Sequence, residues 1–192
     1  MAKRRRPHDF TIRAEAKSLI TSLKGRTLHA LEAAHPGFDV YGAVRLRSGR
    51  GAIDVSCVPK SAQSKDGEWV REFGAFKVRN GRGKGIENPS RVWDPWHYEI
   101  GSVVEGIILV NTHVRQWAYG ELVLEYFYTQ AIALALSDGR FLILDKCDYQ
   151  CDMVSVRFGD RDLDDLVFDD VDDCVGYESY EHLRWERTYE II

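Results

Sequence analysis

Alternation of apolar and polar residues recurs along much of the chain and constrains its fold more than any other sequence feature. Val44 and Leu46 alternate with arginines, the turn-forming sequence Ser48–Gly51 follows, and apolar residues then recur at every second position. A period of two places such residues on one face of a strand. We therefore expect a β-hairpin over residues 40–58 with a basic outer face. Further strands are expected at residues 69–78 (one or two short strands), 103–111, 141–144 and 154–158.

The segment before this hairpin carries a different spacing. Asp9 belongs to a residue type that caps helices, and apolar residues recur at helical intervals from position 12 to position 34. The sequence His35–Gly37, with its central proline, would end such a helix. We expect one amphipathic helix here, either kinked or divided in two at Gly25.

A second helix is predicted near the C-terminus. In the acidic segment from Asp160 to Asp173, apolar residues beginning with Leu163 recur at helical intervals. Because regular strand–helix alternation is missing, the order of elements indicates an α+β fold rather than a parallel, doubly wound sheet. We expect an N-terminal amphipathic helix packed on a mainly antiparallel sheet, with this short acidic helix near the C-terminus.

Residues 122–136 fit two structures. Their content of Val, Tyr, Phe and Thr favours a strand, whereas Glu121, Glu125 and Thr129 would share one face of a helix. Both alternatives stay open from the sequence. Residues 60–67 and the Gly-, Arg-, Asn- and Pro-rich residues 79–95 are expected to form loops.

Composition points to a globular protein with one domain. The chain has 192 residues, of which 44% are hydrophobic and 29% charged, and its five prolines do not suggest long disordered tracts. We expect a basic tail over residues 1–8 and a single α+β domain over residues 9–192. The basic start lacks a following apolar stretch, and the longest nearly apolar run, residues 122–136, is too short to span a bilayer. We therefore expect a cytoplasmic protein with reduced cysteines and no membrane partner.

Charge is divided unevenly between the two halves of the chain. Residues 1–96 hold 19 Lys and Arg against 10 Asp and Glu, a formal charge of +9, whereas residues 97–192 hold 7 against 20, a charge of −13. Such separation concerns partners rather than fold. It predicts a binding protein, rather than an enzyme, that engages nucleic acid or another polyanion through phosphate contacts. The predicted contact residues are Arg4, Arg5, Arg6, Arg13, Lys17, Lys24, Arg45, Arg47, Arg50, Arg79, Arg82, Lys84, Trp93 and Trp96.

Two neighbouring motifs within this set indicate how a nucleic acid could be bound. Three glycines between Arg79 and Gly85 would let the backbone approach a phosphate closely, although the spacing matches neither a P-loop nor a dinucleotide-binding loop. Trp93 and Trp96 follow, and they would either stack on unpaired bases or fasten the loop to the core.

The acidic half supports an alternative function of a different class. An acidic surface on the C-terminal half could cover the basic active site of a nuclease or other toxin, as an intracellular inhibitor or immunity-type protein does. This alternative predicts a basic protein as the partner. Its contact residues would be Asp160, Asp162, Asp164, Asp165, Asp169, Asp170, Asp172 and Asp173.

No catalytic, metal or cofactor site is predicted. His97 and Asp94 have no nucleophile beside them in the sequence, and a nuclease centre on Asp54 or on Asp138 and Asp145 lacks a recognisable spacing. The aspartates after position 160 miss the glycine and the final glutamate of a calcium loop. The spacing of Cys147, Cys151, Cys174 and His182 does not match a usual zinc site.

Overall fold

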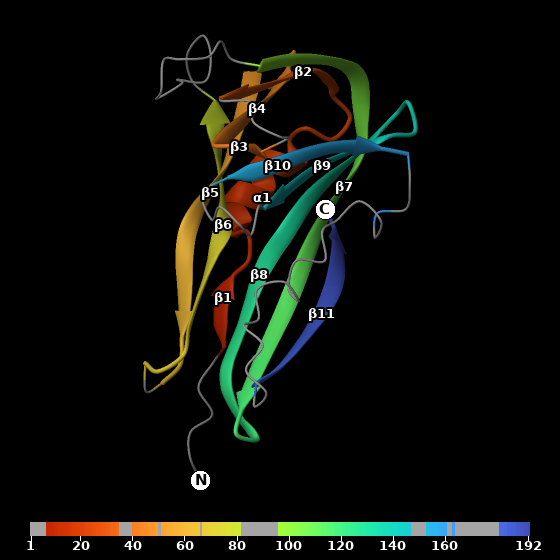
Figure 1. The fold of residues 1–192 in the computed structure, drawn as a ribbon. Coiled ribbons are helices and arrows are strands. Elements are labelled where there is room, and N and C mark those ends of the chain that lie inside the picture. Colours follow the sequence, from red (N-terminus) through yellow and green to blue (C-terminus); the bar gives the residue numbers. More distant parts are fainter. Residues whose placement is uncertain are drawn as a thin grey trace.

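The protein is dominated by one large, mainly antiparallel sheet (Figure 1). This computed structural model describes residues 7–34, 40–49, 51–65, 67–81, 96–146, 153–160, 163 and 181–192. The expected α+β fold, with an N-terminal helix packed on a sheet, was therefore wrong, because these residues form a sheet-dominated fold with only one short helix. The elements are β1 (His8–Phe10), α1 (Ala14–Thr21), β2 (Thr27–Ala34), β3 (Val40–Tyr41), β4 (Ala43–Ser48), β5 (Gly51–Gln63), β6 (Val70–Gly81), β7 (Trp96–Ala118), β8 (Glu121–Leu136), β9 (Phe141–Lys146), β10 (Val154–Gly159) and β11 (Glu181–Ile191).

The sheet is so strongly curved that most of its strands form a closed ring. Hydrogen-bonded neighbours follow the order β3-β10-β9-β8-β7-β2-β4-β5-β6, and only Gly42 separates β3 from β4. Starting at β4, the hydrogen-bonded strands run through β2, β7, β8, β9 and β10 to β3. Because β3 directly precedes β4 in the chain, this series of strands forms a closed ring. β11 pairs with the C-terminal part of β7, and β1 adds a parallel strand to β8. The curvature lets strands that are distant in sequence enclose one core.

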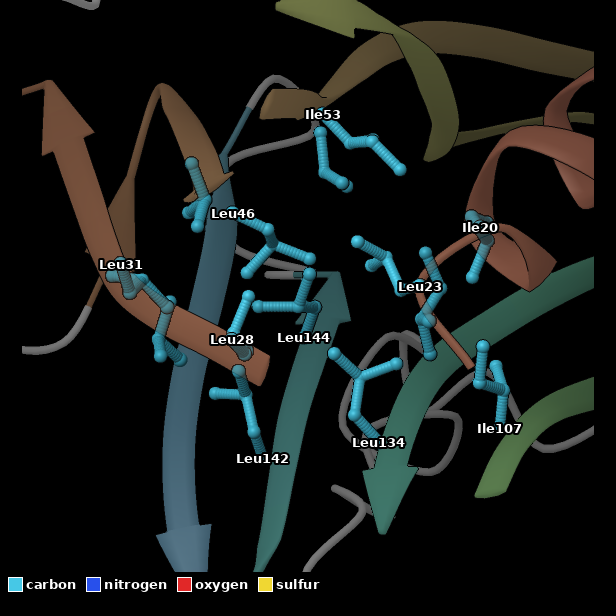
Figure 2. Packing of buried hydrophobic residues seen from close by; sticks show 14 of the residues in the cluster. Ile20, Leu23, Leu28, Leu31, Leu46, Ile53, Ile107, Leu134, Leu142 and Leu144 are labelled. Carbon is cyan, nitrogen blue, oxygen red and sulfur yellow. The ribbon is translucent and has the colours of Figure 1, made fainter. Parts of the chain in front are cut away.

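Helix α1 fills the inside of this curved sheet. Ile20 of the helix and Leu23 of the following turn are buried against Leu134 of β8 and Leu144 of β9, with leucines of β2 and β4 nearby (Figure 2). Burying a side chain of this size contributes about 1.5–3 kcal/mol. The sequence predicted a long amphipathic helix packed on the sheet, whereas α1 is short and lies inside a curved sheet.

The predicted helix was wrong at both ends. Asp9, which was expected to cap it, lies in strand β1, and the helix runs only from Ala14 to Thr21. Gly25 adopts a positive φ of +74°, which favours glycine, and its N–H donates to the carbonyl oxygen of Val104 at 2.8 Å. The chain then forms β2 between β4 and β7. Leu28 and Leu31 are fully buried there, and both belong to the main core because a β-bulge at His29 shifts the alternation of side chains between them.

Strands β7 and β8 are long, and the face that they bury changes along their length. Near the start of their pairing, Ile107 and Leu109 point into the main core. Beyond a β-bulge at Gln130, the opposite face is buried instead, with Val114 and Tyr126 packed in a second cluster. The face that was internal beside α1 therefore continues as a more exposed surface toward the ends of these strands.

Other strand predictions were confirmed or extended. β4 and β5 form the expected hairpin with Ser48 opposite Gly51, and residues 122–136 lie in strand β8. β5 extends to Gln63, into part of the expected loop over residues 60–67. A strand within residues 181–191 was not predicted. Of the acidic segment expected to be helical, only Asp160 and Leu163 are among the described residues.

Candidate binding surfaces

A row of four charged residues with alternating sign, extended by a histidine, crosses five strands. Directly opposed residues on neighbouring strands have side chains on the same face of a sheet. The row consists of His97 (β7), Glu32 (β2), Arg45 (β4), Asp54 (β5) and Arg79 (β6). Each acidic residue in it lies between two basic or potentially basic residues, so the predicted basic outer face of the hairpin is largely neutralised.

The centre of this row is a buried ion pair. Arg45 Nε donates to Asp54 Oδ1 at 2.6 Å and Nη2 donates to Oδ2 at 3.0 Å, while the Arg45 side chain is only 3% exposed. The hydrogen bond to Asp54 raises the pKa of Arg45. A Cβ on Gly81 would lie 2.9 Å from both Asp54 Oδ1 and the Cβ of Ala52, so β6 approaches the pair closely because it carries glycine here. Arg45 is therefore not at the surface, where a phosphate contact would need it.

Glu32 holds a second arginine of the predicted site. Arg47 Nε donates to Glu32 Oε1, and His97 Nδ1 lies 3.9 Å from the same oxygen. These contacts place Arg47 in an ion pair on the protein itself. They also place His97 next to Glu32, whereas its sequence neighbour Asp94 lies outside the described residues.

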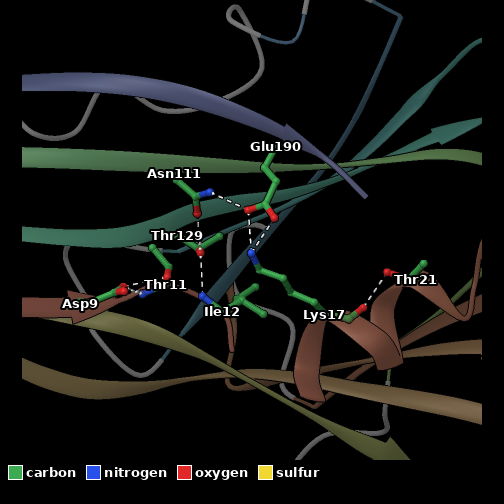
Figure 3. A network of polar contacts seen from close by, with 8 residues as sticks. All are labelled: Asp9, Thr11, Ile12, Lys17, Thr21, Asn111, Thr129 and Glu190. Atoms are coloured by element: carbon green, nitrogen blue, oxygen red, sulfur yellow. Dashed lines mark hydrogen bonds and ion pairs between the residues drawn. The ribbon is translucent and has the colours of Figure 1, made fainter. Parts of the chain in front are cut away.

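Lys17 belongs to a polar network that ties α1 to the C-terminal strand (Figure 3). Its ammonium group donates to both carboxylate oxygens of Glu190, at 2.6 and 2.7 Å, and Asn111 Nδ2 donates to Glu190 at 3.4 Å. Thr129 Oγ1 donates to Asn111 Oδ1 and accepts the backbone N–H of Ile12. The network joins α1 and the segment before it to β7, β8 and β11.

The remaining described residues of the predicted polyanion site are more accessible, apart from Trp96. Arg13, Lys24 and Arg79 are exposed, and Lys24 Nζ lies 3.4 Å from the carbonyl oxygen of Ile192. Trp96 is half-buried and stacks on Tyr98 at a centroid distance of 5.6 Å. Arg13 and Lys24 therefore remain on the surface beside the network of Lys17.

Several predicted residues lie outside the part of the chain that the structure describes. Asp160 of the acidic set is described and exposed. Those outside are Arg4, Arg5, Arg6, Arg50, Arg82, Lys84 and Trp93 of the polyanion set, and Asp162, Asp164, Asp165, Asp169, Asp170, Asp172 and Asp173 of the acidic set.

The carboxylates considered for nuclease chemistry have separate partners. Asp138 accepts hydrogen bonds from Arg140 and Ser102, which hold the pKa of Asp138 well below its ordinary value. Asp145 lies fully buried in β9 and accepts a hydrogen bond from Gln130 at 3.0 Å. Across the residues with described positions, no group of three or more His, Cys, Asp or Glu side chains could hold a metal ion.

A second surface, formed by β7, β8 and β11, was missed from the sequence. It is the continuation of the α1-facing side beyond the bulge, and we call it the aromatic face. Its rows run across β11, β7 and β8 in that order. They are Thr188–Asn111–Thr129, Glu186–His113–Phe127, Arg184–Arg115–Glu125 and His182–Trp117–Leu122.

Contacts within these rows confirm that the side chains share one face. His113 stacks on Phe127 with ring centroids 4.0 Å apart, and its Nε2 lies 3.0 Å from Glu125 Oε1. The guanidinium of Arg184 lies over the ring of Trp117 at 5.5 Å. His113, Trp117 and Phe127 are all partly exposed, and none belongs to the buried clusters formed by the described residues.

Sequence patterns could have revealed this surface. Asn111, His113, Arg115 and Trp117 occupy every second position, which is the period of a strand with one polar or aromatic face. The strand over residues 103–111 was expected to end before His113, so this pattern was not followed to Trp117. The partner strands β8 and β11 were respectively ambiguous and unpredicted.

Comparisons with known proteins identify no relative. No protein family model matches the chain, and no curated protein and no solved structure matches it significantly. Within the described ranges, no helix has the length and apolar character needed to cross a membrane.

Proposed function

We propose that this protein binds nucleic acid or a similar polyanion without catalysing a reaction. The observation that carries the proposal is the position of Arg13 and Lys24, which stay exposed on either side of α1. They add to the +9 charge of the first 96 residues. Phosphate contacts from such residues favour association with polyanions and weaken as salt concentration rises.

The structure narrows the set of contact residues that the proposal uses. Arg45 and Arg47 form ion pairs within the sheet, and Lys17 is bound by Glu190. A phosphate would have to compete with a carboxylate at each of these three positions. The proposal therefore rests on Arg13, Lys24 and Arg79 among the described residues.

A salt titration with a labelled oligonucleotide tests the proposal. The double variant Arg13→Ala/Lys24→Ala should bind more weakly, and the slope of log affinity against log salt should flatten by roughly 1.5, as expected for two lost phosphate contacts. The matched control is Lys60→Ala/Lys65→Ala, which removes two exposed lysines near the β5–β6 turn. Absence of salt-dependent binding by the wild type, to oligonucleotide and to heparin alike, would refute the proposed function.

One observation favours the alternative, a protein whose acidic half covers a basic partner. Leu163 is buried against Val110, Ala133 and Ile143, on the outside of the curved sheet. This contact would hold the start of the acidic segment against the body of the protein. Purification of the untagged protein separates the two functions, since the proposal expects copurifying nucleic acid and the alternative a stoichiometric basic protein.

A further inference from the structure

We infer that the aromatic face is a binding site for single-stranded nucleic acid, whose unpaired bases stack on Phe127, His113 and Trp117. The inference rests on the proposed function and adds to it a surface and a ligand class. None of these three residues was among the predicted contacts. The site would read bases through ring faces, so its sequence preference would be weak.

The geometry of the face suits a strand of a few nucleotides. From Asn111 to Trp117 the face extends along β7 for about 20 Å, given a rise of about 3.3 Å per residue. The stacked rings of His113 and Phe127 lie near its middle, and Trp117 lies near one end. Two aromatic positions along one strand offer separate platforms for successive or nearby bases.

Charge on the face favours bases at its centre and phosphates at its margins. Glu125 lies next to His113, and Glu186 Oε1 accepts a hydrogen bond from Arg115 at 2.6 Å, so both carboxylates are already engaged. Arg184 lies over Trp117 rather than in an ion pair with another described residue. With one face of the guanidinium on Trp117, the N–H groups of Arg184 can hold a phosphate while a base stacks on the exposed part of the Trp117 ring.

The opposite end of the face meets the basic residues of the proposed function. Lys17 contacts Glu190 and, through it, Asn111, which begins the aromatic face. Arg13 follows Ile12, whose N–H is bound by Thr129 in the same row as Asn111. A strand lying along β7 would therefore pass from the aromatic rings toward exposed cations. A duplex would present phosphates to these cations but no accessible ring faces to the aromatic residues.

Leucine substitutions test the role of the rings while keeping apolar volume in the sheet. Phe127→Leu and Trp117→Leu should each weaken binding of a short oligothymidylate by at least about fivefold, because each removes a stacking platform. The matched control is Tyr189→Leu, which changes an exposed aromatic residue of β11 that lies on the opposite face. Binding of an abasic strand of equal length should be the same for all four proteins.

Ligand comparison separates this inference from the proposed function. We expect the wild type to bind oligothymidylate and oligouridylate more tightly than a duplex or an abasic strand. Equal affinity for all of them, with unchanged affinity in both leucine variants, would refute base stacking on this face while leaving polyanion binding intact. Loss of binding to every polyanion in the wild type would refute both.

Photocrosslinking of the wild type tests the site without any substitution. Tryptic cleavage after Arg115 and Arg140 yields one peptide that contains both Trp117 and Phe127, because no Lys or Arg lies between these arginines. After ultraviolet irradiation with oligouridylate, mass spectrometry should show this peptide with the added mass of a nucleotide. Crosslinks confined to peptides that contain none of His113, Trp117 and Phe127 would overturn the assignment, even if the leucine variants fail to fold.

Discussion

Two ion pairs with the same nitrogen–oxygen distance should differ severalfold in their contribution to the free energy of unfolding. Arg45–Asp54 and Lys17–Glu190 both have a closest nitrogen–oxygen distance of 2.6 Å. Their side chains are 3% and 13% exposed in the first pair, but 29% and 41% exposed in the second. Solvent screens the second pair, whereas removal of one partner from the first leaves a charge that water reaches poorly.

The expected magnitudes follow from this difference in burial. Asp54→Ala should lower the free energy of unfolding by about 3 kcal/mol or more, because it leaves the buried Arg45 guanidinium without its carboxylate. Glu190→Ala should cost about 1 kcal/mol or less. For a chain of this size, a loss of 3 kcal/mol corresponds to a fall in Tm of about 6–12 °C.

Urea denaturation of the two single variants measures the difference, and a double-mutant cycle identifies its source. Arg45→Met removes the charge while keeping much of the buried apolar stem, so Arg45→Met/Asp54→Ala should recover part of the stability lost in Asp54→Ala alone. Similar losses in Asp54→Ala and Glu190→Ala would contradict the argument from burial. Strict additivity of Arg45→Met and Asp54→Ala would show that the two side chains are not coupled.

Two further substitutions test local features of the sheet. Gly81→Ala should destabilise the protein by about 1–3 kcal/mol, since the added Cβ meets Asp54 and its neighbours at less than contact distance; a urea midpoint equal to that of the wild type would show that the strands separate without cost. The pKa of Asp138 is lowered by Arg140, so its stabilisation is present above an unfolded-state pKa of about 3.9 and is lost as pH falls toward the native value. Asp138→Asn should accordingly reduce stability near neutral pH more than in strong acid, and equal losses at both pH values in denaturation curves would exclude this linkage.

Local sequence determined those elements in which the spacing of apolar residues and the residue types of the turn indicate the same structure. The hairpin of β4 and β5 follows from alternation of Val44 and Leu46 with arginines and from a glycine-containing turn that closes at Gly51. Asp138 and Gly139, between β8 and β9, likewise are residue types that favour turns, and Gly139 adopts a φ of +85°. In both places neighbouring residues alone fix the backbone, so no distant contact was needed for the prediction.

Tertiary structure decided the segment that follows α1. Ala30, Leu31 and Ala34 continue the apolar face of the expected helix, but the same segment can form a strand, and in the structure Leu28, Leu31 and Ala33 of that strand belong to the main core. The choice depends on β4 and β7, which supply the hydrogen-bonding partners of β2 from either side. Those partners lie far along the chain, and their positions cannot be read from the periodicity of the segment itself.

For the candidate sites, too, some features followed from the sequence and others only from the tertiary structure. The sequence determined the charge separation, because it requires only counting, and it revealed which residues could contact a phosphate. A hairpin with its turn at Ser48–Gly51 already places Asp54 opposite Arg45. The sequence did not reveal that β6 lies beside this pair, or that Phe127 lies opposite His113, since those registers depend on the pairing of whole strands. Only the folded sheet removes Arg45 from the surface and brings the aromatic rings together, because burial and cross-strand contact arise when distant segments pack.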